Sequence, residues 1–118
     1  MFYEKIVYDH FENPSNVGTL SNHTHSAIAG SPETGAIIKL TATINNNIIE
    51  DIAFKAYGGG AVIACMSILT EKIKGENVEK ALEIKPNDLN EILHLEPIKY
   101  IYSILAVDVL HKMLGKAF

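Results

Sequence analysis

Two alternating segments separated by three asparagines limit the fold more than any other feature of the chain. Apolar residues recur at every second position from Ala36 to Asn45, and the alternation repeats from Ile48 to Tyr57. Because successive side chains of a strand point to opposite faces, this period predicts two half-buried strands. Asparagine tolerates left-handed backbone angles, so Asn45-Asn46-Asn47 predicts the turn between them. The two segments therefore predict an antiparallel β-hairpin with one apolar face.

Three glycines follow the hairpin and lead into an apolar helix. Gly58-Gly59-Gly60 precedes a helical pattern from Ala61 to Lys74, and Gly75 is placed to cap its end. The first nine residues of this helix are apolar on nearly every side, so we expect its N-terminal half to be buried. Cys65, the only cysteine, lies within it. Free backbone amides at a helix start suit an anion or a closely approaching ligand, which makes the glycine turn a candidate site.

Helices and one polar loop account for the rest of the chain. The spacing of apolar residues and the capping signals predict four more helices, at Tyr3–Phe11, Asn77–Ile84, Asn87–His94 and Ile98–Leu114. The polar segment Ser15–Ser31 is predicted to be a loop. No repeat, linker or low-complexity segment divides the sequence, so residues 1–118 are expected to form a single domain. The order of the elements predicts an α+β fold, with α-helices packed on one face of a small antiparallel β-sheet.

Composition and charge exclude several classes of protein. The formal net charge is -4 and no run of Lys or Arg stands out, so we expect neither nucleic acid nor an anionic membrane surface as a partner. The first residues lack the basic region and apolar core of a signal peptide, and no apolar stretch approaches the roughly 18 residues of a membrane helix. A single cysteine fits a reducing compartment, and we expect a cytoplasmic protein.

Several motifs occur in order along almost the whole chain. The segment from Tyr8 to Gly18 is similar to a "DHYENPRNVG" opening, and the other motifs are Gly30–Gly35, Ile49–Lys55, Tyr57–Gly60, Leu95–Lys99 and Ser103–Asp108. In this series the chain resembles the U-type iron–sulfur cluster scaffold proteins, which include IscU, SufU and the N-terminal domain of NifU. The resemblance implies the SufE/NifU-type fold and a place in iron–sulfur cluster assembly.

The resemblance also implies where a cluster would be held. The family holds a nascent [2Fe–2S] cluster with three cysteines, assisted by an aspartate and a histidine. By resemblance the cysteines fall on Thr34, Gly59 and Tyr102. The aspartate falls on Ala36 and the histidine on Ile101. Thiolates suit iron and accept sulfur, whereas the residues found here do not, so we expect none of the five to ligate.

The leading interpretation is a scaffold-family protein whose cluster site is degenerate. We expect a binding or regulatory role, in which the chain docks on the cysteine desulfurase or another assembly protein, or pairs with a complete scaffold subunit. We expect no catalytic residue, no enzymatic activity and no resident cofactor; a [2Fe–2S] cluster or a single iron or zinc ion is implied by the family alone. Leu95–Lys99 resembles the "LPPVK" segment that binds an Hsp70-type chaperone, but Glu96 replaces the first proline, which argues against chaperone binding.

Two other interpretations stay open. In the first, Cys65 and the histidines His23 and His25, together with Tyr102, form a relocated site for a metal ion or for sulfur. The plainer interpretation is that Cys65 is a small buried apolar residue and that the two histidines lie in a solvated loop. The second alternative is a small enzyme or anion-binding domain whose ligand lies at the Gly58–Gly60 turn.

Overall fold

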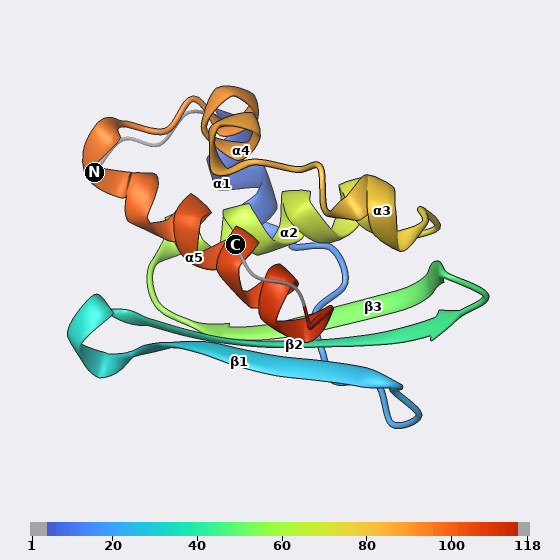
Figure 1. Ribbon diagram of the computed structural model, residues 1–118. Helices are drawn as coiled ribbons and strands as arrows, with labels where there is room; N and C mark the ends of the chain where they lie inside the picture. Colours follow the sequence, from blue (N-terminus) through green and yellow to red (C-terminus); the bar gives the residue numbers. More distant parts are fainter. Residues whose placement is uncertain (1–4, 116–118) are drawn as a thin grey trace.

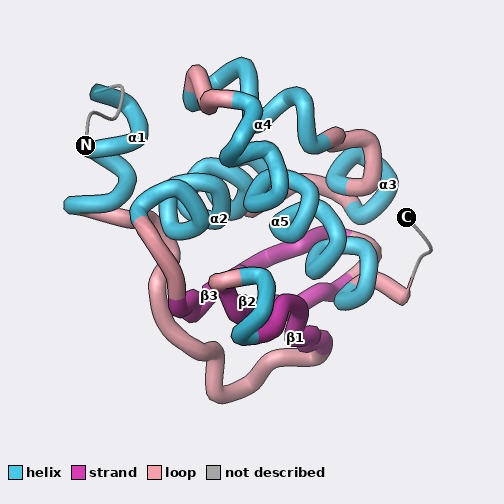
Figure 2. Tube along the Cα trace, turned by 90° about the vertical axis from the view of Figure 1, so that its left-hand side faces the viewer, coloured by secondary structure: helices cyan, strands magenta, loops and turns pink. Residues whose placement is uncertain are grey.

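The computed structural model describes residues 5–115, which form a three-stranded antiparallel sheet with helices on one of its faces (Figures 1 and 2). The sheet has the order β1-β2-β3, with β1 at His25–Ser31, β2 at Ala36–Asn45 and β3 at Ile48–Tyr57. The helices are α1 (Lys5–Glu12), α2 (Gly60–Ile73), α3 (Val78–Ala81), α4 (Pro86–Leu93) and α5 (Tyr100–Met113), with short 3-10 turns η1 (Pro32–Thr34) and η2 (Pro97–Lys99). The predicted α+β fold is confirmed.

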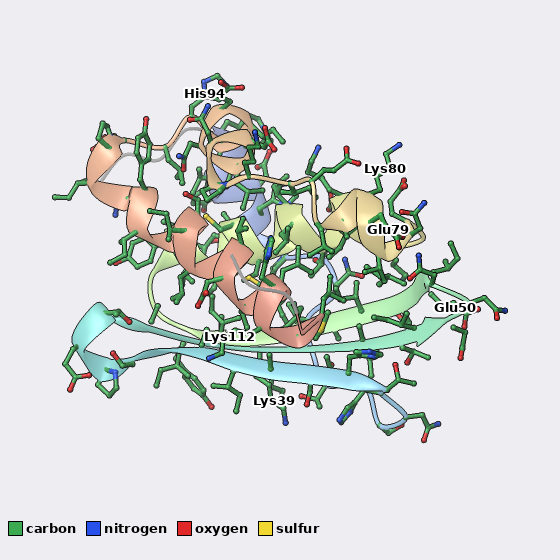
Figure 3. The ribbon with its side chains drawn as sticks, in the orientation of Figure 1. Lys39, Glu50, Glu79, Lys80, His94 and Lys112 are labelled. Carbon is green, nitrogen blue, oxygen red and sulfur yellow. The ribbon has the colours of Figure 1, made fainter. Side chains whose placement is uncertain are left out.

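The predicted hairpin is formed by β2 and β3. Leu40 lies opposite Phe54 and Ala42 opposite Ile52, and all four side chains are buried beneath the helices. The turn is made by Asn46 and Asn47, whose φ angles of 51° and 66° are the left-handed values that asparagine tolerates. The register shifts once, between Thr43 and Ile44. On the other face Lys39 points away from the helices (Figure 3).

The strand β1 corrects the prediction of a loop from Ser15 to Ser31. Residues 25–31 pair along their whole length with β2, from His25 opposite Ala42 to Ser31 opposite Ala36. Burial alternates along β1 even though its inward side chains are small, as at Ala27 and Ala29. The prediction was wrong because alanine, serine and glycine carry little hydrophobic signal. Their small size allows α5 to pack directly on this strand.

The helix α2 lies at the centre of the molecule. It contacts β3, α5, α1 and α4, and its buried residues extend from Gly60 to Ile73, so burial reaches beyond the predicted N-terminal half. Leu69 and Met66 are fully buried in the same core as Phe54 and Leu110. A helix that is apolar on nearly every side requires neighbours on every side. No helix within residues 5–115 is long and apolar enough to cross a bilayer.

The other predicted helices are present with shifted ends. The helix predicted at Tyr3–Phe11 is observed as α1 from Lys5, and residues 3 and 4 lie outside the described part of the chain. The helix predicted from Ile98 begins as the 3-10 turn η2 and becomes α-helical at Tyr100. The helix α3 is shorter than predicted, with Asn77 as its N-cap. Shifts of one or two residues are the size expected at helix ends, whereas α3 ends three residues before the predicted Ile84.

Between α1 and β1 the chain passes along β3 and then beneath the sheet. The backbone N–H of Phe54 donates to the carbonyl of Asn16, and the N–H of Gly18 donates to the carbonyl of Phe54, both at 2.8 Å. The Leu20 N–H donates to the buried hydroxyl of Thr41 at 3.2 Å, on the face opposite the helices. The segment therefore pairs with the free edge of β3 and covers part of the outer face (Figure 1, light blue).

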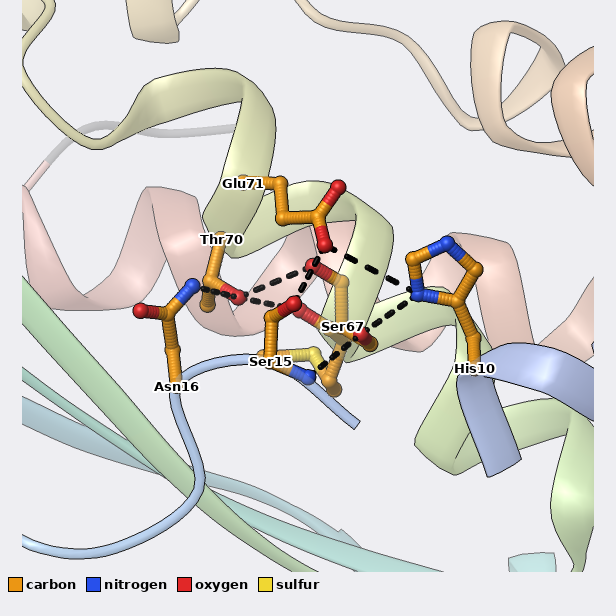
Figure 4. Close-up of polar contacts among 7 residues, drawn as sticks. His10, Ser15, Asn16, Ser67, Thr70 and Glu71 are labelled. Carbon is orange, nitrogen blue, oxygen red and sulfur yellow. Dashed lines mark hydrogen bonds and ion pairs between the residues drawn. The ribbon is translucent and has the colours of Figure 1, made fainter. Parts of the chain in front are cut away.

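A polar cluster fastens α1 and this segment to α2 (Figure 4). The Nδ1 atom of His10 and the Oγ atom of Ser67 share a hydrogen bond of 2.7 Å, and the backbone N–H of Ser15 donates to the same hydroxyl at 2.9 Å. The Ser15 hydroxyl donates to the Glu71 carboxylate, and Asn16 donates to Thr70 at 3.0 Å. Ser67 therefore binds both α1 and the segment after it, and Thr70 and Glu71 add further attachments to the same side of the molecule.

Replacing Ser67 by alanine should destabilise the protein. The Ser67→Ala variant leaves the Ser15 amide and the His10 ring nitrogen without their shared partner, which should cost about 1–3 kcal/mol. Urea unfolding followed by circular dichroism measures this loss. The matched control is Ser26→Ala on the exposed side of β1, which should change the free energy of unfolding by less than about 0.5 kcal/mol. Equal effects of the two substitutions would show that the cluster does not hold the N-terminal part.

Candidate functional site

The positions that the scaffold resemblance assigns to cluster ligands lie at one end of the sheet. Thr34 ends η1, Ala36 begins β2 and Gly59 is the N-cap of α2. Ile101 and Tyr102 lie in the first turn of α5. In Figure 1 η1, the β3–α2 connection and the start of α5 all lie at the left side, and Thr34 and Ile101 line one hollow. The fold therefore gathers positions that are up to 68 residues apart, since 102 − 34 = 68.

Gly58 is required by the close packing of this end. Its φ angle is +150°, and a Cβ atom built there would lie 2.7 Å from Cγ1 of Val62. The same Cβ would lie 3.1 Å from the Gly35 carbonyl oxygen and 3.3 Å from the Ala36 Cβ. Any larger residue would push the β3–α2 connection away from the η1–β2 connection, so glycine at position 58 holds the two together.

Gly59 differs from its neighbour because it has room for a side chain. Its φ of -80° and ψ of -178° are open to any residue, and a Cβ built there meets no atom within 4 Å. Position 59 is thus an exposed place at the start of α2 from which a side chain would point into open space. A cysteine ligand would fit there without any change of backbone.

The hydroxyl of Thr34 is occupied by its own turn. Its Oγ1 atom lies 2.8 Å from the carbonyl oxygen of Ser31 and 3.0 Å from that of Ala36, and it accepts the Ser31 N–H at 3.1 Å. Gly35 follows in the left-handed conformation, with φ of 78°. Thr34 therefore stabilises the connection between β1 and β2, a role that leaves no free donor atom for a metal.

An apolar hollow lies where α5 begins. It has a volume of about 270 Å³ and is lined by Thr34, Ile101, Tyr102, Ile104, Leu105 and Asp108. A Cβ at position 35 would lie 3.9 Å from the Tyr102 hydroxyl, so the Tyr102 side chain reaches the η1–β2 connection. Three of the five expected ligand positions thus line one hollow, but their side chains make it apolar.

Cys65 lies in the core, away from solvent. It is fully buried in α2, and burial raises the pKa of its thiol to about 12. The thiol is therefore protonated at neutral pH, whereas metal binding and sulfur transfer both need the thiolate. In this position a cysteine acts as a small apolar side chain.

The two loop histidines are placed at the other end of β1. His23 bonds through Nδ1 to the Leu20 carbonyl oxygen at 2.8 Å, and His25, which begins β1, bonds to the Thr24 hydroxyl at 2.7 Å. His25 and η1 lie at opposite ends of β1, which at 3.3 Å per residue places them about 20 Å apart. Within residues 5–115 no three His, Cys, Asp or Glu side chains are grouped so that they could hold a metal ion. The structure does not bring Cys65 and these histidines together.

Half of the residues that line the hollow were not predicted as site residues from the sequence. Ile104, Leu105 and Asp108 line it but were not identified as site residues. The available signal was their spacing, because residues three, four and seven positions after Ile101 share one face of a helix. That signal could not show what lies opposite this face, since Thr34 arrives from a distant segment.

Comparison with known proteins identifies relatives over almost the whole chain. The model of the family described as NifU-like N terminal domain matches residues 2–116. The iron-sulfur cluster assembly scaffold protein IscU of Buchnera aphidicola subsp. Schizaphis graminum is 45% identical over 114 residues, covering 93% of this chain and 89% of the relative. IscU of Escherichia coli K12 is 43% identical with the same coverage.

Solved structures share the fold. The putative scaffold protein for the SUF system from Fervidobacterium islandicum AW-1 superposes with a TM-score of 0.82 at 17% identity, covering 95% of this chain and 96% of that one. The N-terminal NifU-like protein of Brucella abortus gives a TM-score of 0.79 at 13% identity, covering 95% and 91%. Both likenesses concern the arrangement of the backbone.

The two adjacent glycines should respond differently to alanine. Gly58→Ala places a Cβ against Val62 in a backbone conformation reserved for glycine, so it should lose at least about 1–3 kcal/mol of unfolding free energy. Gly59→Ala enters open space and should cost less than about 1 kcal/mol, which is the loss expected because alanine caps a helix less well than glycine. Thermal and urea unfolding of the two variants make the comparison. If Gly59→Ala were as damaging as Gly58→Ala, position 59 would not be open for a side chain.

Proposed function

The chain belongs to the family of NifU-like N-terminal domains, and from this membership we propose that it serves iron–sulfur cluster assembly as a docking or regulatory member that does not build a cluster itself. It is a member of the scaffold family by sequence and by fold. One observation carries the proposal: the five expected ligand positions are gathered at one end of the sheet, but their side chains contain no thiolate, imidazole or carboxylate.

The residues at these positions do not fit a cluster. Glycine, alanine and isoleucine have no atom that could bind iron, and the Thr34 hydroxyl is engaged by its own turn. Tyr102 offers one phenol oxygen, whereas iron–sulfur clusters are held by several soft thiolates. Cys65 is a buried, protonated thiol in α2. These features support a role based on binding partners, without catalysis.

The proposed partner is a cysteine desulfurase or another cluster-assembly protein, or a complete scaffold subunit. The end of the molecule that carries the ligand positions also exposes large apolar side chains, with Tyr57 75% and Ile98 80% accessible. Large apolar side chains left exposed to solvent are common at interaction surfaces. We do not propose chaperone binding through Leu95–Lys99, because Leu95 is buried and residues 97–99 form the 3-10 turn η2 in place of an extended strand.

Binding to the desulfurase of the same organism tests this proposal. Isothermal titration calorimetry should detect a complex, and the desulfurase rate should change when the chain is added. Tyr57→Ser should weaken the complex about tenfold, a loss of about 1.4 kcal/mol. Ile28→Ser removes a similarly exposed apolar group from the outer side of β1 and should leave affinity unchanged. If no complex forms and the rate does not change, the desulfurase is not the partner. Titration with a complete scaffold subunit would then test whether that subunit is the partner.

Anaerobic reconstitution with ferrous iron and sulfide tests the degenerate site. The natural chain should remain colourless and bind no stoichiometric iron. The triple variant Thr34→Cys, Gly59→Cys, Tyr102→Cys should gain visible absorption and bound iron, because the backbone already gathers these positions.

The matched control for that experiment is Thr34→Ser, Gly59→Ala, Tyr102→Phe, which alters the same positions without adding thiols. It should stay colourless. Stoichiometric iron in the natural chain that disappears in Cys65→Ser would contradict the proposal and favour the relocated site.

A further inference from the structure

The hollow at the start of α5 is small for a cofactor pocket but large enough to take an aliphatic side chain. Its volume of about 270 Å³ lies below the range of roughly 300–1,000 Å³ that small-molecule and cofactor pockets occupy. Three of its walls are the side chains of Ile101, Ile104 and Leu105, on one face of α5, and Thr34 closes it from η1. Ile101 and Ile104 remain 45% and 51% exposed at its rim. An apolar group that entered would cover surface that the chain itself leaves in water.

The hollow also contains one unpaired carboxylate. Asp108 is half-buried in its wall, and no hydrogen bond or ion pair to it occurs within residues 5–115. Lys112 lies one turn further along α5, but its Nζ donates to the carbonyl of Ile28 on β1 at 2.7 Å (Figure 3). A cation supplied by a partner molecule would therefore be attracted to this half-buried carboxylate.

A second carboxylate lies beside the hollow. Glu33 directly precedes Thr34 in η1 and is exposed. A hydrogen bond from its own backbone amide, and then one from the Ser31 hydroxyl, lower the pKa of Glu33 below its usual value. It is therefore ionised at neutral pH. Together with Asp108 and the net charge of -4, it makes this surface favourable to a basic partner and unfavourable to an anion.

We propose that this hollow is a socket for one aliphatic side chain that a partner protein carries next to a lysine or arginine. The aliphatic group fills the space between Ile101, Ile104 and Leu105, and the neighbouring cation pairs with Asp108. This deepens the proposed function, on which it rests for the choice of surface, by giving the chemistry of the partner segment. The socket stands where the family places cluster ligands, so a site for metal chemistry becomes a site for peptide recognition.

Peptides test the socket without the desulfurase. The ¹⁵N-labelled full chain is titrated in NMR experiments with capped Gly-Lys-Leu-Lys-Gly, Gly-Lys-Ser-Lys-Gly and Gly-Glu-Leu-Glu-Gly. The first peptide should shift the amide signals of Thr34, Ile104 and Asp108 and bind about tenfold more tightly than the other two. Equal binding of the serine peptide would mean that charge alone acts, and equal binding of the glutamate peptide that apolar contact alone acts. Either result overturns the proposal, as do shifts confined to another surface.

Two variants locate the interaction. Asp108→Asn and Ile104→Ser should each weaken the leucine peptide about tenfold, while Glu83→Gln, which removes an exposed carboxylate in another groove, should not. The salt dependence of binding should fall in Asp108→Asn and stay unchanged in Ile104→Ser. Unchanged binding in Asp108→Asn overturns the assigned cation partner.

The outcomes separate the socket from the proposed function. Desulfurase binding without peptide binding would overturn the socket and leave the proposed docking function in place. Peptide binding without binding to any assembly partner would support the socket and overturn the proposed docking function. Sedimentation of the free chain supplies a further check. A dimer that Ile104→Ser dissociates would make a second copy of this chain the occupant and would overturn the basic partner segment.

Discussion

The complete burial of α2 is the constraint on which the rest of the structure depends. Its apolar side chains face the sheet, α5, α4 and α1 at once, so each of these elements is held in place by contact with it. Its few buried polar groups have defined partners, since Ser67 binds His10 and Ser15 and Thr70 binds Asn16. Gly59 is the N-cap of the same helix, so the packing of the core also positions the candidate site.

The candidate site combines a fold shared with solved scaffold structures and side chains that lack the expected ligand groups. Gly58 allows the β3–α2 connection to approach η1 closely, and Gly59 beside it leaves open space. The volume that ligand side chains would enter is bordered by isoleucine, leucine and tyrosine, with Asp108 as the carboxylate. The proposed docking role rests on this chemistry, because iron needs thiolates whereas such a surface offers burial and one charge.

Several elements could be predicted because their signals are local. Alternation specified both hairpin strands, and the asparagines specified the turn through their tolerance of left-handed angles. The motif series indicated the scaffold family before any contact was known. The strand β1 escaped prediction because its inward residues are alanines, whose burial depends on α5 packing against them. Asp108 escaped because spacing places Lys112 one turn away from it and cannot reveal that Lys112 binds the Ile28 carbonyl instead.

The amino-acid sequence by itself determined the hairpin, the apolar helix, the family and the identity of the residues at the five ligand positions. These depend on periodicity and on residue type, which are properties of short segments. Only the tertiary structure decided that Thr34 and Tyr102 share one hollow, that Cys65 is a protonated thiol in the core and that His25 lies in a strand. Those facts depend on how distant segments pack, because burial and proximity arise only when the helices close over the sheet.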